Sequence, residues 1–85
     1  MKKVVIYTGN LCPHCDRAKE LLNKKKIEFT EYNITKDFLK MEEMLKKSNG
    51  MRTIPQIFIG EMHVGGNYEL QALEHKGKLD SLLKN

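Results

Sequence analysis

The stretch VVIYTGNLCPHC, residues 4–15, decides how this chain of 85 residues folds. It begins in a short run rich in β-branched residues, Lys3 to Thr8, which predicts a buried central strand, and Gly9-Asn10 predicts the turn that follows. Beyond this turn, apolar side chains recur with helical spacing on one face: Cys15, Ala18, Leu21 and Leu22. The segment Cys12-Pro13-His14-Cys15 therefore lies at a strand-to-helix turn, and both thiols belong to the start of a helix.

The start of a helix favours the thiolate form of a cysteine, which is its nucleophilic form. Backbone N–H groups without helical partners and the positive end of the helix dipole stabilise an anion there. Cys12 falls at the cap position, where we expect its sulfur to accept hydrogen bonds from the amides of His14 and Cys15. Pro13 suits the first helical position because its φ is already helical. A separation of three residues places both sulfurs on one helix face, so the sequence predicts a dithiol that cycles to a disulfide, with Cys12 as the anion.

The first helix is expected from Pro13 to Lys26. It leads to a strand of mixed polarity, Glu28 to Ile34, which we place near a sheet edge. Thr35 is expected to cap a second helix, which Ser48-Asn49-Gly50 ends. In that helix apolar residues recur with helical period: Phe38, Leu39, Met41, Met44 and Leu45. Strand, helix and strand in this order predict two parallel strands joined by a right-handed crossover.

The second half of the chain has a different pattern. Gln56 to Ile59 and Met62 to Val64 are two short strands separated by Gly60-Glu61, which predicts an antiparallel hairpin. Gly65-Gly66 then opens a third helix from about Asn67 to His75. A short last helix carries Leu79, Leu82 and Leu83. No linker or repeat divides the chain, so residues 1–85 are predicted to form one α/β domain, a mixed four-stranded sheet with helices on both faces.

The net charge of +4 does not by itself indicate a nucleic-acid partner. The run Lys24-Lys25-Lys26 falls at a predicted helix end, where cations complement the dipole and stay solvated, and no aromatic residues interleave with it. Only four apolar residues follow Met1-Lys2-Lys3, too few for a signal or membrane segment. We therefore expect no nucleic acid and no membrane as partner. We expect the reducing cytoplasm, where a close Cys-x-x-Cys pair is redox-active or metal-binding more often than structural.

Three separated motifs occur in the order and spacing of one known family: Cys12-Pro13-His14-Cys15, Thr53-Ile54-Pro55 and Gly65-Gly66. With them the whole chain resembles a dithiol (class I) glutaredoxin, a small member of the thioredoxin-like superfamily. The resemblance implies the thioredoxin-like fold in the order β-α-β-α-β-β-α. It also implies a glutathione-dependent thiol-disulfide oxidoreductase, with Cys12 as nucleophile and Cys15 as resolving cysteine. Its substrates would be proteins that contain disulfides or are glutathionylated.

The resemblance also implies where glutathione binds. Thr53-Ile54-Pro55 matches the family segment whose proline is cis, which leaves the backbone N–H and C=O of Ile54 open to an extended peptide. The alternative interpretation is a proline that merely starts a strand. Arg52, just ahead of this segment, is expected to take the carboxylate at the glycine end of glutathione. A solvated arginine is the alternative there.

The corner at Gly65-Gly66 is the second part of the implied site. Its close turn and the free amides of Asn67 and Tyr68 would receive the γ-glutamyl carboxylate. Glu69 would meet the γ-glutamyl ammonium group. A plain tight turn with Asn67 as the helix cap, and a Glu69 that is only exposed, are the alternative interpretations.

Two positions depart from the family pattern. Many relatives carry lysine three residues before the first active-site cysteine, and here that position is Gly9. The middle of the dithiol motif usually holds tyrosine, and here it holds His14. A partly charged His14 would add to the stabilisation of the thiolate, whereas an uncharged one is only an exposed ring.

Two alternative functions stay open at this point. A glutaredoxin-like redoxin reduced by thioredoxin reductase would keep the chemistry and change the electron donor. A metal or iron–sulfur carrier would use the two thiolates as soft ligands. A closed zinc site needs four ligands, and the histidines have no spacing that suggests they converge, so we predict no metal site. We expect no tightly bound cofactor, glutathione as co-substrate, and a monomer.

Overall fold

The computed structural model of the protein describes residues 1–84. Along the chain, its elements are β1 (Val4–Thr8), α1 (Pro13–Lys24), β2 (Thr30–Asn33), α2 (Phe38–Lys47), β3 (Gln56–Ile59), β4 (Met62–Gly65), α3 (Asn67–His75) and α4 (Leu79–Leu83). The strands form one sheet in the order β2-β1-β3-β4. β1 is parallel to β2 and antiparallel to β3, and β4 is antiparallel to β3. The predicted mixed sheet, with its central first strand, its edge second strand and its hairpin, is confirmed.

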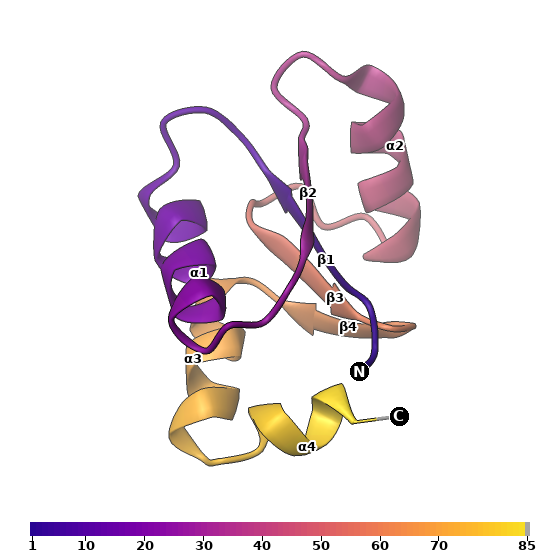
Figure 1. Ribbon diagram of the computed structural model, residues 1–85. Coiled ribbons are helices and arrows are strands. Elements are labelled where there is room, and N and C mark those ends of the chain that lie inside the picture. The colour runs from indigo at the N-terminus through magenta and orange to yellow at the C-terminus, as the bar shows by residue number, and fades with distance from the viewer. Residues whose placement is uncertain (85) are drawn as a thin grey trace.

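Helices cover both faces of the sheet (Figure 1), as predicted. On one face α1, α3 and α4 pack against alternate residues of β1, Val4 and Ile6. On the other face Val5 and Tyr7 join a smaller core with Met44 of α2. All five residues of β1 are buried, because a central strand covered on both faces has no side open to solvent. β1 therefore runs through the middle of the core and ends at the turn that leads to Cys12.

The start of α2 differs from the prediction. Asp37, not Thr35, is its N-cap, and the Asp37 carboxylate accepts a hydrogen bond from the amide of Lys40 at 3.0 Å. Thr35 lies in the preceding turn, where its hydroxyl accepts from the amide of Asn10 at 2.8 Å. Both residue types are good caps, and aspartate stands directly before the first helical residue. The Thr35 hydroxyl is thereby left free to hold the loop that leads to Cys12.

The predicted ends of two elements were too long. α1 ends at Lys24, before the left-handed turn at Lys26, whose φ is 59°. β2 begins at Thr30 rather than Glu28. Both elements are correctly placed, and only their bounds differ. The longest helix of residues 1–84 has 12 residues, and none of their helices is long and apolar enough to cross a bilayer.

Tyr7 ties the buried strand to α2, and this contact gives a pH-dependent prediction. The Tyr7 hydroxyl donates a hydrogen bond to the Glu43 carboxylate, and this bond lowers the pKa of Glu43 below its ordinary value. We expect Tyr7→Phe to reduce the free energy of unfolding at neutral pH by about 1 kcal/mol, the typical net worth of one hydrogen bond. Urea unfolding of the two proteins measures this difference.

The sign of the pH dependence follows from the direction of the pKa shift. A carboxylate with a lowered pKa adds stability above its unfolded pKa and loses it as pH falls through its folded pKa. The difference between the Tyr7→Phe variant and the unmodified protein should therefore shrink on acidification below about pH 4. Tyr32→Phe is the control, since the Tyr32 hydroxyl donates to no group within residues 1–84. A Tyr7→Phe deficit that persists unchanged in acid would contradict this role of Glu43.

Candidate active site

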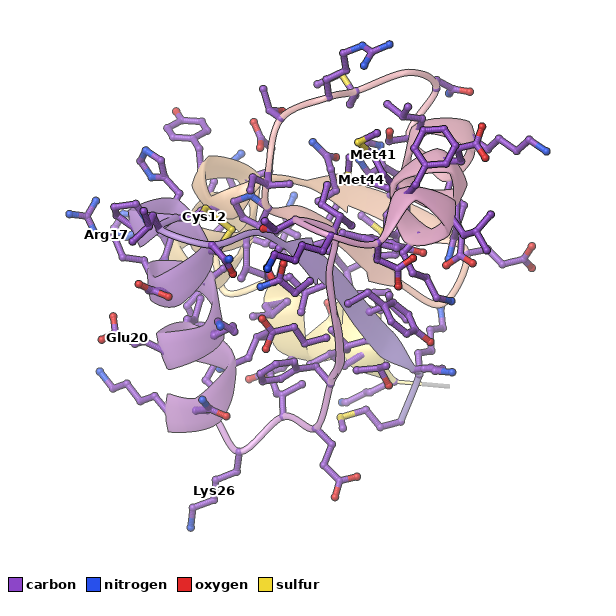
Figure 2. The ribbon with its side chains drawn as sticks, turned by 90° about the horizontal axis from the view of Figure 1, so that it is seen from above. Cys12, Arg17, Glu20, Lys26, Met41 and Met44 are labelled. Carbon is purple, nitrogen blue, oxygen red and sulfur yellow. A yellow bond between two sulfur atoms is a disulfide. The ribbon has the colours of Figure 1, made fainter. Side chains whose placement is uncertain are left out.

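Cys12 and Cys15 form a disulfide at the start of α1, with 5.2 Å between their Cα atoms. Figure 2 shows the sulfur atoms beside Cys12 at the end of this helix. Cys12 is the N-cap of α1, Pro13 is its first residue, and the amide of Cys15 lies 3.1 Å from the Cys12 sulfur. The predicted second donor, the amide of His14, makes no such bond in the described part of the chain. The two thiols are thus close enough to cycle between dithiol and disulfide.

The two cysteines differ in exposure. Cys15 is only 1% exposed and packs under the first turn of α1, whereas Cys12 is partly exposed. An incoming thiolate or disulfide therefore reaches Cys12 first. Cys15 is placed to attack only a partner already bonded to Cys12. His14, between them, is exposed.

The loop before Cys12 is held by polar side chains that the sequence interpretation did not assign to the site. The amide of Asn10 donates to the Thr35 hydroxyl, and the Asn10 side-chain oxygen accepts from Asn33 at 2.9 Å. Leu11, the residue before Cys12, has a left-handed φ of 53°. These bonds fix the loop to the end of β2, and no pattern in the sequence pairs residues so far apart.

The segment Thr53-Ile54-Pro55 lies beside the dithiol. Its Ile54-Pro55 peptide bond is cis, as the resemblance implied. The carbonyl oxygen of Ile54 is 3.9 Å from the Cys12 sulfur. Arg52 and Thr53 are exposed, and Pro55 is buried. The structure therefore brings the backbone of Ile54 to the reacting sulfur, although the two residues are 42 positions apart.

A buried glutamine secures this segment from beneath. The Gln56 side-chain amide donates to the carbonyl oxygen of Thr53 at 2.9 Å and to the Thr53 hydroxyl at 3.1 Å. The Gln56 side-chain oxygen lies 2.6 Å from Nε2 of His63, whose ring stacks on Phe58. The sequence prediction placed Gln56 and His63 in strands, considered His63 otherwise only as a zinc ligand, and assigned neither to the site. A glutamine in an otherwise apolar buried strand was the signal available, because a buried amide needs partners.

The turn from β4 into α3 forms the other side of the site. Gly65 has a φ of 116°, and Gly66 is the N-cap of α3. A Cβ atom on Gly66 would lie 3.4 Å from the carbonyl oxygen of Pro55, so these two segments are in close contact. Asn67 and Tyr68 follow as the first two helical residues, whose amides have no acceptor within the helix. Free amides at the start of a helix can donate hydrogen bonds to a bound carboxylate.

Glu69 is exposed, as its alternative interpretation held, but its side chain also makes a hydrogen bond at the start of α3. Its carboxylate accepts a hydrogen bond from the amide of Gly66 at 2.8 Å. This bond satisfies one of the free amides at the start of α3 and leaves those of Asn67 and Tyr68. Asn67 is not the helix cap, because that position belongs to Gly66.

The site offers few metal ligands. Among the described residues, no group of three or more histidine, cysteine, aspartate or glutamate side chains could hold a metal ion. His63 is engaged with Gln56 and Phe58. A metal carrier would therefore have the two thiolates and no third ligand from residues 1–84.

Comparisons with known proteins agree on one family. The model of the Glutaredoxin family matches residues 4–64. The chain is 50% identical over 84 residues to Glutaredoxin 3 of Escherichia coli strain K12, covering 99% of this chain and 100% of that protein. The solution structure of a glutaredoxin from Brucella melitensis has a TM-score of 0.84 and 51% identity, covering 99% of this chain and 90% of that one. A dithiolic glutaredoxin of Trypanosoma brucei brucei has a TM-score of 0.84 and 34% identity, covering 98% and 88%.

Proposed function

This chain belongs to the glutaredoxin family, and we propose that it reduces disulfides through Cys12 and Cys15 with glutathione as the electron donor. As a family member it is a thiol-disulfide oxidoreductase of the glutathione-dependent class. The observation that supports these two residues most strongly is their disulfide at the start of α1, with Cys12 as the more exposed partner. We assign Cys12 as nucleophile and Cys15 as resolving cysteine.

With a glutathionylated protein, the Cys12 thiolate attacks the glutathione sulfur. A disulfide forms between Cys12 and glutathione, the bond to the protein breaks, and the protein leaves as its thiolate. The thiolate of a second glutathione then attacks the Cys12-bound glutathione sulfur. The products are oxidised glutathione and the regenerated Cys12 thiolate, so this route needs only one cysteine.

With a protein disulfide, both cysteines take part. The Cys12 thiolate attacks one sulfur and releases the other as a thiolate. The deprotonated Cys15 then attacks the Cys12 sulfur, which releases the reduced protein and leaves the Cys12–Cys15 disulfide. Two glutathione molecules reduce that disulfide and leave as oxidised glutathione. The described structure holds the protein in this disulfide form.

We propose that the glutathione moiety lies along the segment Thr53-Ile54-Pro55. Its cysteine part would pair with the backbone of Ile54, in the manner of an added strand, next to Cys12. The γ-glutamyl carboxylate would accept from the amides of Asn67 and Tyr68, where the helix dipole favours a negative charge. Arg52, exposed beside this segment, would pair with the carboxylate at the glycine end. Glu69 would both hold Gly66 and face the γ-glutamyl ammonium group.

We propose further that residues 1–85 form a single domain that acts as a monomer in the cytoplasm. No tightly bound cofactor and no nucleic-acid or membrane partner enters this mechanism. Glutathione is the co-substrate, and disulfide-containing or glutathionylated proteins are the partners. The glutathione pool of a reducing compartment supplies the electrons.

A coupled assay tests the electron donor. The reduced protein is given a mixed disulfide of glutathione and 2-mercaptoethanol, and NADPH consumption is followed with glutathione plus glutathione reductase or with thioredoxin reductase. We expect turnover with glutathione and no comparable turnover with thioredoxin reductase. The opposite result would replace glutathione by thioredoxin reductase as the donor and would contradict the proposed function.

A further inference from the structure

Gly9 stands against the side chain of Ile54. A Cβ atom built on Gly9 would lie 2.5 Å from the Cδ1 atom of Ile54, closer than two carbon atoms can approach without displacement. The next nearest atom, the hydroxyl oxygen of Thr35, is 3.4 Å away, and no further atom lies within 4 Å apart from those of Gly9 and its two chain neighbours. The φ of Gly9 is outside the left-handed region. The backbone therefore accepts any residue at this position, and the δ-methyl group of Ile54 is the main obstacle to a side chain.

Ile54 has a side chain that is partly exposed and is held on one side by packing. Its side chain packs against the smaller core, formed by Val5, Tyr7, Met44 and Phe58. Its carbonyl oxygen is the backbone atom 3.9 Å from the Cys12 sulfur. Moving the δ-methyl group away from Gly9 requires either a change of rotamer at Ile54 or a shift of the segment that carries the carbonyl.

We propose that Gly9 and Ile54 form a steric pair that positions the main-chain binding surface for glutathione. Gly9 is a positioning residue: the lack of a side chain at Gly9 lets Ile54 occupy the place from which its backbone faces both Cys12 and the bound peptide. This inference rests on the proposed glutathione function and adds a positioning residue to the same site. It assigns a role to a glycine whose own backbone conformation does not require glycine.

The proposal makes the effect of a side chain at position 9 depend on residue 54. Valine lacks the δ-methyl group but keeps both γ-carbons, and neither γ-carbon of Ile54 lies within 4 Å of the added Cβ. Gly9→Ala should therefore collide with Ile54 in the unmodified protein and meet no part of residue 54 in the I54V background. The comparison is a double-mutant cycle, which isolates the interaction between two neighbouring positions.

Steady-state kinetics with a glutathionylated peptide test the pair. We expect G9A to raise KM by about five-fold or more in the unmodified background, because overpacking displaces the binding segment. We expect a rise of less than about two-fold when G9A is added to I54V, and a kcat that changes less than KM in either background. A KM that does not rise with G9A, or that rises equally in both backgrounds, would overturn the proposal.

Gly77→Ala is the control that separates a rise in KM at the site from a general loss of stability. Gly77 has a φ of 70° and no atom within 4 Å of an added Cβ, so G77A introduces backbone strain beyond the far end of α3. We expect G77A to lower the thermal unfolding temperature and to leave KM unchanged. A rise in KM equal to that of G9A would show that destabilisation alone is responsible.

The contact between Gly9 and Ile54 can also be tested by NMR, without any measurement of activity. The nuclear Overhauser effect between the Ile54 δ-methyl protons and the Gly9 α-protons should be strong in the oxidised protein, and its absence would overturn the pairing. If the unmodified protein has no activity with glutathione, the proposed function fails, and this measurement still decides whether Gly9 and Ile54 are in contact.

Discussion

Changing Cys12 to serine should abolish turnover of both substrate classes, whereas changing Cys15 to serine should abolish only the reduction of protein disulfides. Cys12 makes the first bond in both routes, and Cys15 is needed only to release a protein bonded to Cys12. Its near-complete burial, 1% exposed, keeps it from replacing Cys12 as the attacking thiol. The measurements are turnover of a glutathionylated peptide and of insulin disulfides, with glutathione and glutathione reductase.

Serine is close in size to cysteine, so neither variant removes packing at the start of α1. Thermal unfolding of both reduced variants, compared with the reduced unmodified protein, checks this. Equal loss of peptide turnover in the two single variants would contradict the assignment. Residual peptide turnover in Cys12→Ser that equals that of Cys15→Ser would reverse the two roles.

Gly65→Ala should raise KM for the glutathionylated peptide by about ten-fold or more, which corresponds to about 1.4 kcal/mol of binding free energy. Gly65 has a φ of 116°, which is strained for any residue with a side chain. A Cβ there would also lie 3.0 Å from both Cγ and Oε1 of Glu69. Pushing Glu69 away breaks its hydrogen bond to the Gly66 amide. The first amides of α3, which are the proposed carboxylate site, then lose their position.

Gly60→Ala is a control for adding a side chain at a glycine with positive φ. Gly60 also has a left-handed φ, 58°, but its nearest contact with an added Cβ is the flexible Lys2 side chain at 3.5 Å. It lies in the hairpin turn at the opposite end of β4. We expect a smaller loss of thermal stability, because a φ of 58° is within the left-handed region open to L-residues, and an unchanged KM. A Gly65→Ala variant with the KM of the unmodified protein would show that the start of α3 does not hold glutathione.

The parts of the fold that depend on local patterns could be predicted from the sequence. β1 is a short apolar run, and α3 begins after a glycine pair, so both were placed within a residue of their observed bounds. The start of α2 was misplaced because Thr35 and Asp37 are both good caps, and only the tertiary contact of Thr35 with Asn10 distinguishes them.

The candidate site, like the fold, has parts that local sequence predicts and parts that it does not. The dithiol turn was visible because its two cysteines and the helix that they start are adjacent in sequence. The support beneath it was not visible, because it joins residues that are distant along the chain. Gln56 reaches back to Thr53 and across to His63, and the methyl group of Ile54 fills the space beside Gly9. Sequence alone gives the residue types for such contacts but not their distances.

The central claim is that the sulfur of Cys12 is held as an anion where α1 begins. The rate of alkylation of Cys12 by iodoacetamide, followed against pH in the reduced Cys15→Ser protein with free glutathione alongside, tests it most directly, because only the thiolate reacts. We predict that the half-maximal rate for Cys12 falls at a clearly lower pH than that for glutathione. A half-maximal rate at the same pH or a higher one would contradict the account.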